Sequence, residues 1–110
     1  MATIDDFAAL DIRVGMIKEA EFFEEAKIPA IKLKIDFGPE IGMKSSSAQI
    51  TKRYNAEDII GRQIVGIINF PPRRIAGFKS EVLVLGGVLE KGDVILLKPD
   101  TEIPNGTPIA

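Results

Sequence analysis

Apolar and polar residues alternate along much of the chain with the two-residue period that is typical of β-strands. The segment from Ile12 to Phe22 or Phe23 alternates in this way, and the next strand ends at Gly38-Pro39. The two faces of that second strand differ sharply: one carries Ile31, Leu33, Ile35 and Phe37, and the other carries Lys32, Lys34 and Asp36. We therefore expect its apolar face to lie in a core and its charged face in solvent.

Further strands follow at short intervals. The segment IGMKSSSA, from Ile41 to Ala48, continues the pattern less regularly. QIVGIINF is an almost continuous apolar run, which is typical of a strand buried on both faces, and Pro71-Pro72 ends it. EVLVLGG and DVILLKP are two more predicted strands, separated by the turn GVLEKG.

A short helix is predicted from Thr3 to Leu10. Thr3 is suited to cap its first turn, and Asp6 completes a weak capping box three residues later. Ile4, Phe7 and Leu10 share one face of this helix by their spacing. A helix of this length is marginal alone, so this apolar face must pack on something.

A second helical signal lies in ITKRYNAEDIIG, with Asn55 as a plausible N-cap and Gly61 as a plausible C-cap. A helix between the third and fourth of five strands is the arrangement of an OB barrel. The predicted fold class is therefore all-β: a five-stranded OB-fold barrel with a short helix between strands 3 and 4. A short N-terminal helix and a C-terminal extension complete it.

The composition narrows the chemistry. With 110 residues, the chain is predicted to form a single domain, residues 1–110. It contains no cysteine and no histidine, so disulfides, thiolate metal sites and imidazole catalysis are excluded. We expect no enzyme activity, no metal and no cofactor. The N-terminus lacks the features of a signal peptide, and no apolar run reaches the length of a membrane span, so we expect a cytoplasmic protein without membrane insertion.

Charge is distributed unevenly along the chain. The formal net charge is −2, but the segment from Ile41 to Ser80 carries seven Lys or Arg and two acids. The remainder carries seven basic residues and fourteen acids. An acidic protein of this kind can still present a local basic patch.

The most concentrated cations lie in NFPPRRIAGFKS, between two predicted strands. Pro71 and Pro72 fix the backbone at this corner, and Arg73 and Arg74 offer planar forks that suit phosphate or carboxylate. Lys79 adds a point charge. The alternative is a solvated turn whose charges keep a hairpin tip in water.

Basic residues on the first three strands could extend this corner into a stripe across one face. The alternative is that they are ordinary outward charges of alternating strands. The candidate ligand-binding residues are Arg13, Lys32, Lys34, Lys44, Asn69, Arg73, Arg74, Lys79 and Ser80. Tyr54 is the only tyrosine, so few aromatic side chains are available to stack on bases. Any RNA binding should therefore depend on phosphate contacts and weaken as the salt concentration rises.

Four segments in order, LDIRVGMI, KLKIDFG, GRQIVGIINFPPRRIAGFKSEVLVLGG and IPNGTPI, resemble the tRNA-binding OB domain. That domain occurs free-standing and appended to methionyl- and phenylalanyl-tRNA synthetases and EMAP-II-like cytokine precursors. The length is similar to that of the stand-alone CsaA-type subgroup, named as secretion chaperones. The resemblance implies an OB fold, a homodimer, and binding of tRNA or unfolded export precursors, with the export motor ATPase SecA as a further partner.

The chain departs from the family after Ser80. Glu81 and Val82 stand where the family usually has glycine and methionine, which adds an acid where an RNA phosphate would approach. The low pI of 5.2 points away from tRNA in the same way.

Apolar residues near the two ends lie outside the barrel pattern. They either plug one end of the barrel or form the seam of a two-fold dimer, and the resemblance favours the dimer. The predicted dimer residues are Ile4, Phe7, Leu10, Ile103, Pro104 and Ile109.

Three functions compete at this point. The favoured hypothesis is a homodimeric export chaperone that binds unfolded precursors through its OB-fold dimer surface. The alternative is a structure-specific tRNA-binding protein that uses a basic face. An enzyme built from carboxylates, lysines or Tyr54 ranks far below both.

Overall fold

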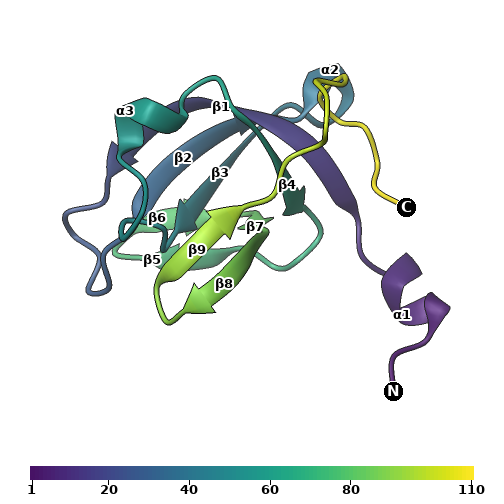
Figure 1. Cartoon of the computed structure of the whole chain (residues 1–110), viewed down its shortest axis with the longest axis horizontal. Helices are drawn as coiled ribbons and strands as arrows, with labels where there is room; N and C mark the ends of the chain where they lie inside the picture. Colours follow the sequence, from purple (N-terminus) through teal and green to yellow (C-terminus); the bar gives the residue numbers. More distant parts are fainter.

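Nine strands and three short helices lie along residues 1–110 of the computed structural model (Figure 1). Five of the strands form one antiparallel sheet in the order β3-β2-β1-β4-β7, while β5–β6 and β8–β9 are separate hairpins. None of the helices is long and apolar enough to cross a membrane. The elements in chain order are α1 (Ile4–Ala8), β1 (Ile12–Phe22), β2 (Ile31–Asp36), α2 (Gly38–Ile41), β3 (Met43–Ala48), α3 (Ala56–Ile59), β4 (Gln63–Ile67), β5 (Arg73–Ile75), β6 (Phe78–Ser80), β7 (Leu83–Val84), β8 (Gly86–Glu90) and β9 (Asp93–Leu96).

The interior of the barrel contains the apolar face predicted for β2. Its four residues from Ile31 to Phe37 are each 0–2% exposed, which confirms the alternation. β4 is buried on both faces, as its continuous apolar run predicted. Ile64 packs inside the barrel, whereas Val65 and Ile67 pack with Ile12 and Val14 in a second cluster.

The sheet is closed into a barrel by hydrogen bonds between β3 and residues 80–82. The N–H of Glu81 donates to the carbonyl of Ser45 at 2.8 Å, and the buried hydroxyl of Ser46 donates to the carbonyl of Val82 at 2.7 Å. Side chains from the facing segment accept from β3: Glu81 from Ser45 N–H at 2.9 Å, and Ser80 from Ser47 N–H at 3.0 Å. This closure, with α3 between β3 and β4, confirms the OB-fold barrel.

The predicted C-terminal extension pairs with the first residues of β1. Val14 donates to the carbonyl of Thr107 and accepts from the N–H of Gly106, at 3.0 and 2.7 Å, and Ile109 donates to Ile12 at 2.9 Å. These residues of β1 lie before its ladder with β2 begins at Met16. The tail therefore supplies hydrogen-bond partners to backbone groups of β1 that β2 does not reach.

The strand predicted from Ile41 to Ala48 is wrong at its start. Ile41 ends the short helix α2, and β3 begins only at Met43. Gly38 and Gly42, with φ of 89° and 82°, make the sharp bends on either side of this helical turn. Glycine adopts such backbone angles without the steric cost that a side chain would add.

The predicted turn GVLEKG is also wrong in extent. Gly86–Glu90 forms β8, and the reversal into β9 lies at Lys91-Gly92 alone. Likewise, the cationic corner is not an open turn, because β5 and β6 pair across the two residues Ala76 and Gly77. Both hairpins lie largely at the surface, so they lack the alternation of buried and polar positions that marks a core strand.

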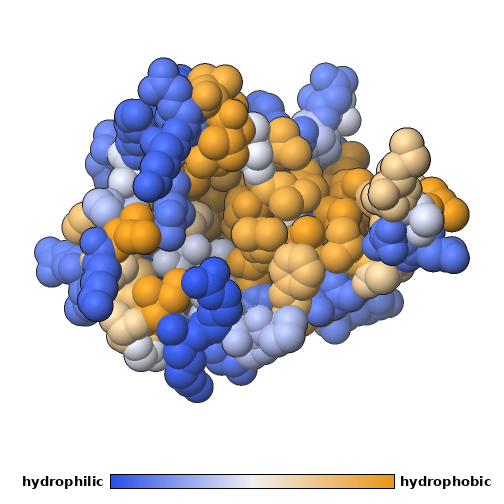
Figure 2. All heavy atoms as spheres, turned by 90° about the horizontal axis from the view of Figure 1, so that it is seen from below, coloured by the Kyte–Doolittle hydropathy of each residue, from blue (hydrophilic) through white to orange (hydrophobic).

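The N-terminal helix is capped as predicted. Thr3 N–H donates to the Asp6 carboxylate at 2.8 Å, and Asp6 N–H donates to the Thr3 hydroxyl at 3.3 Å. No residue of α1 is buried, however, and Figure 1 shows it standing beyond β1, clear of the barrel. The helix therefore does not plug the barrel, and its apolar face lacks a cover. Figure 2 shows a broad apolar area on the same side of the molecule.

Gly15 in β1 is a packing requirement of the barrel. A Cβ atom built on Gly15 would lie 2.7 Å from Ile35 Cγ2 and from Phe37 Cε1, both in the core. We predict that Gly15→Ala lowers the free energy of unfolding by about 1–3 kcal/mol, measured by guanidinium denaturation. The control is Gly87→Ala, where a Cβ would meet nothing within 4 Å. Equal stability of the two variants would contradict this account.

Candidate functional site

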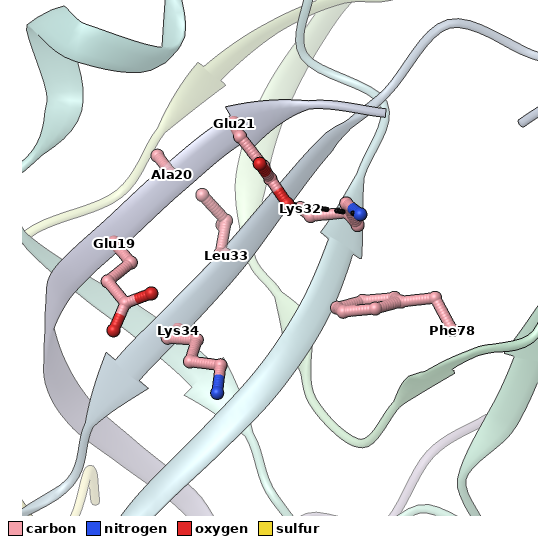
Figure 3. A pocket seen from close by; sticks show the side chains of 7 residues that line it. All are labelled: Glu19, Ala20, Glu21, Lys32, Leu33, Lys34 and Phe78. Atoms are coloured by element: carbon pink, nitrogen blue, oxygen red, sulfur yellow. Dashed lines mark ion pairs between the residues drawn. The ribbon is translucent and has the colours of Figure 1, made fainter. Parts of the chain in front are cut away.

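The strands and loops that bind ligands in OB barrels here surround a shallow pocket. Such barrels bind ligands on the face of strands 2 and 3, between the loops that join strands 1–2 and 4–5. In this chain the two loops are residues 23–30 and residues 68–82, and the second contains the β5–β6 hairpin. The pocket, of about 150 Å³, is lined by Glu19, Ala20, Glu21, Lys32, Leu33, Lys34 and Phe78 (Figure 3).

Lys32 is held in place by three neighbours. Its Nζ lies 3.1 Å from Glu21 Oε1 and 5.1 and 5.6 Å from the ring centres of Phe23 and Phe78. The two rings meet edge to face at 5.5 Å, so they join the β1–β2 loop to the hairpin. Cation–π contacts and an ion pair both satisfy this ammonium, so it is not a free charge for a ligand.

Lys34 is the exposed cation of this pocket. It is outside every ion pair of the structure, although Glu19 is its cross-strand neighbour. Figure 3 shows Glu19 and Lys34 on adjacent strands, both reaching toward the open side of the pocket. The pocket therefore presents mixed charge rather than a purely positive surface.

The β5–β6 hairpin holds the two arginines rigidly. Ala76 and Gly77 form its two-residue turn with φ of 47° and 81°, and Arg74 donates to the carbonyl of Gly77 at 3.3 Å. Neither Arg73 nor Arg74 has a carboxylate partner, whereas Lys79 lies 3.8 Å from Glu81. Because neighbouring residues of a strand point to opposite faces, the two guanidinium groups serve different sides of the hairpin.

Arg73 borders a groove that the sequence did not reveal. Two hollows of about 320 and 280 Å³ share Ser47, Gln49, Arg73 and Ile75 among their lining residues. We call these hollows together the corner groove. The β1–β2 loop, including Ile28, lines one end of it, and Phe70 and Leu83 line the other. The groove thus combines apolar walls with two cations that are in no ion pair, Lys27 and Arg73, and with the carboxylates of Glu25 and Glu81.

Three predicted ligand residues have other neighbours. Arg13 lies under the C-terminal tail, where it donates to Asp11 at 2.6 Å and to the carbonyl of Gly106 at 3.0 Å. Asn69 accepts from the N–H of Asp11 at 2.8 Å and donates to the carbonyl of Ala9 at 2.9 Å. Lys44 pairs with Ile35 across the strands, so it is on the opposite face from Lys32 and Lys34.

The predicted basic stripe is therefore only partly assembled. Lys32, Lys34, Arg73, Lys79 and Ser80 do lie around the β2–β3 face and the hairpin. Of these, Lys34 and Arg73 lack a partner, and Ser80 accepts a hydrogen bond from Ser47. Ligand binding by these residues stays a prediction.

Comparison with known proteins places this barrel in a family. A family model described as "Putative tRNA binding domain" matches residues 12–108. The chain belongs to this tRNA-binding domain family. Among curated relatives, the methionine–tRNA ligase of Methanothrix thermoacetophila is 38% identical over 102 residues, which cover 93% of this chain and 14% of that ligase. The chain thus matches about a seventh of such a ligase.

Solved structures include stand-alone members of similar length. Chaperone CsaA from Bacillus anthracis is 66% identical, with a TM-score of 0.95 over 100% of this chain and 99% of that one. The CsaA chaperone protein of Picrophilus torridus is 53% identical, with a TM-score of 0.91 over the whole of both chains. A MetRS-related protein from Pyrococcus horikoshii is 25% identical, with a TM-score of 0.88, and covers 100% and 98%.

This tRNA-binding domain also exposes an apolar surface that extends beyond the predicted dimer residues (Figure 2). The sequence prediction identified only the two chain ends, and it gave EVLVLGG and DVILLKP as strands without predicting that they expose apolar side chains. Both segments lack the alternation of apolar and polar residues, so a strand formed from either has no polar face to turn to solvent. This feature of the sequence could have indicated the exposed apolar surface. The exposed residues of this surface on the last strands and their neighbours are Phe70, Leu83, Val88, Leu89, Ile95 and Leu97.

An ion-pair clasp fixes the β8–β9 hairpin of this tRNA-binding domain. Arg53 donates to both carboxylate oxygens of Asp93, at 2.9 and 3.0 Å. Lys52 lies 3.8 Å from Glu90 on the same hairpin. The hydrogen bonds from Arg53 hold the pKa of Asp93 below its ordinary value, and the charges of Arg53 and Lys52 act in the same direction. The clasp therefore orients a hairpin that carries much of the apolar surface.

We predict that the clasp contributes stability that depends on pH. Because folding lowers the pKa of Asp93, the contribution is complete above the ordinary value of 3.8 and is lost as the pH falls through the depressed value. Asp93→Asn should therefore lower the free energy of unfolding at pH 7, and its difference from wild type should shrink below pH 4. Urea denaturation from pH 3 to pH 7 measures this. Asp100→Asn, at an exposed carboxylate, is the control. An effect of Asp93→Asn on stability that does not change with pH would contradict a stabilising ion pair between Arg53 and Asp93.

Proposed function

We propose that this chain is a homodimeric chaperone that binds unfolded export precursors in the cytoplasm. The observation that carries the proposal is the apolar surface that the fold leaves uncovered on α1 and on β7–β9. Large exposed apolar areas on soluble domains are interaction surfaces. The likeness of the whole chain to structures titled as CsaA chaperones supports the same function.

The second copy is proposed to cover α1 and the chain ends. Ile4 is 78% exposed and Phe7 is 40% exposed, so the helix face has no partner within the chain. Leu10 and Ile103 pack on the second apolar cluster and extend this face toward the barrel, and Pro104 and Ile109 continue it along the tail. A short arm that projects from the barrel is suited to reach across a two-fold axis, where each copy covers the other.

The corner groove is proposed to receive the client. Its apolar residues suit the side chains that an unfolded precursor exposes, and Arg73 suits an acidic group beside them. Arg73 and Lys27 share the groove with Glu25 and Glu81, so its surface does not favour a polyanion over a polypeptide. Dimerisation would place two such grooves on one particle.

The first prediction tests chaperone function and the dimer together. Wild-type protein in several-fold molar excess should suppress light scattering by a chemically denatured client on dilution. Phe7→Asp should make the protein monomeric by sedimentation velocity and remove most of this suppression, with an unchanged circular dichroism spectrum. A buried charge at the seam disfavours association, while Phe7 is not part of the folded core. Ile60→Asp, at a site 48% exposed, is the matched control and should stay dimeric. No suppression by wild type would refute the chaperone.

A second function is supported by the family and by the unpaired arginines. Arg73 and Arg74 on the β5–β6 hairpin could bind the phosphates of tRNA, with Lys34 on β2 as a further cation. Phosphate contacts release counterions and carry no sequence information. The expected interaction is therefore sensitive to salt and insensitive to tRNA sequence.

For this alternative we predict that Arg73→Ala with Arg74→Ala weakens tRNA binding about tenfold at low salt. The slope of log affinity against log salt should become shallower by about one for each phosphate that the variant no longer binds. Filter binding with several tRNAs across a salt series measures both quantities. Lys91→Ala, at the exposed tip of the β8–β9 hairpin, is the control. Absence of binding at low salt, or binding that ignores salt, would exclude tRNA as a ligand.

A further inference from the structure

The outer edge of β3 is closed by side chains rather than by a neighbouring strand. Ser45 and Ser47 direct their N–H groups away from β2, toward the carboxylate of Glu81 and the hydroxyl of Ser80. One backbone hydrogen bond, from the N–H of Glu81 to the carbonyl of Ser45, crosses this seam beside them. Side chains that satisfy a sheet edge also block its pairing with another chain.

The protection stops before β3 ends. In an antiparallel ladder the N–H and C=O of one residue point to the same side, so the carbonyl of Ser47 also faces the seam. The N–H of Gln49, the second residue after Ser47, makes no hydrogen bond within the chain. One backbone donor therefore remains open just beyond this edge, two residues from a carbonyl that faces the seam.

Both residues line the corner groove. Ser47 and Gln49 line both of its hollows, facing Arg73 and Ile75 of the hairpin. A single residue of a parallel strand bonds to the C=O of one residue and to the N–H of the residue two positions later. The spacing from Ser47 to Gln49 is that of one such pairing site.

We propose that an extended polypeptide binds here by adding to β3 as a parallel strand. This proposal rests on the chaperone function proposed above and deepens it, because it names the client's backbone as the recognised group. Main-chain hydrogen bonds give affinity that does not depend on sequence. Apolar client side chains contact Ile28 and Ile75, and a client carboxylate meets Arg73, which has no acidic partner.

The strength of this contact suits a ligand that must be released. Two hydrogen bonds at a solvent-exposed edge bind weakly. The client strand can pair with more of β3 only when the hydrogen bonds from Ser47 and Ser45 N–H to Ser80 and Glu81 break. Those side chains compete with the client for the same donors, which limits how far β3 can be extended.

Gln49 allows the donor to be removed without disturbing the fold. The N–H of Ile50 bonds to the carbonyl of Ala48, which makes Gln49 the centre of a three-residue turn, and its φ is not positive. Such an inverse γ-turn has a φ near that of proline, and Ala48 is already extended as a residue before proline must be. Gln49→Pro and Gln49→Ala both lose the side chain, and only the proline variant loses the N–H.

The test measures binding of a fluorescein-labelled twelve-residue peptide of alternating Leu and Ser with one central Glu, by fluorescence anisotropy with the dimeric protein. We expect Gln49→Pro to bind about fivefold more weakly than Gln49→Ala, the value of one net hydrogen bond. The same peptide N-methylated through its central segment should bind more weakly still to wild type. Unfolding midpoints of the two variants establish that both are folded.

Each other outcome overturns the proposal in a distinguishable way. Equal affinities of Gln49→Pro and Gln49→Ala, or of the two peptides, would overturn the β3 site even if wild type still suppresses client aggregation. Loss of tRNA affinity in Gln49→Pro, with peptide affinity unchanged relative to Gln49→Ala, would make the groove an RNA site. Failure of wild type both to bind the peptide and to suppress aggregation would overturn the chaperone function as well.

Discussion

Backbone groups at the edges of the barrel sheet need hydrogen-bond partners, and much of this structure follows from how they are supplied. The C-terminal tail satisfies the first residues of β1. Ser80 and Glu81 satisfy the outer edge of β3. A sheet of five short strands has no spare strand for either purpose, so a tail and two side chains perform it. The N–H of Gln49, just after β3, is left without a partner, and Gln49 lines the corner groove between the hairpin and the β1–β2 loop.

Five of the fourteen Lys and Arg of this OB barrel are held in ion pairs within the fold. Arg13 anchors the tail, Arg53 holds the β8–β9 hairpin, and Lys32 is bound by Glu21 and two phenylalanines. These cations stabilise the scaffold and are not available for polyanions. Among the cations that are in no ion pair, Arg73 and Lys27 lie beside the apolar residues of the corner groove, with Glu25 and Glu81. A mixed surface of this kind suits an unfolded polypeptide better than a nucleic acid backbone alone.

Two surfaces of the molecule therefore have separate proposed roles. The apolar face of α1 and of the chain ends is proposed to contact a second copy, since the helix projects from the barrel and its apolar side chains are exposed. The corner groove lies between the hairpin, β3 and the β1–β2 loop, and it is suited to an extended ligand. Proteins that match this domain include a methionine–tRNA ligase and a CsaA chaperone, so proteins of different function share this barrel.

The sequence by itself determined the OB barrel, the buried face of β2, the capped helix α1 and the position of α3. Periodicity, capping and turn residues depend only on neighbouring residues, so a short stretch of sequence is enough to identify them. Tertiary structure alone decided which cations are free, because Arg13 finds its carbonyl partner at Gly106, and Arg53 finds its carboxylate at Asp93. It also decided that Ser80 and Glu81 close β3 and that Gln49 stays open. Hydrogen-bond partners distant in sequence depend on how strands come together, and no local pattern of residues encodes that arrangement.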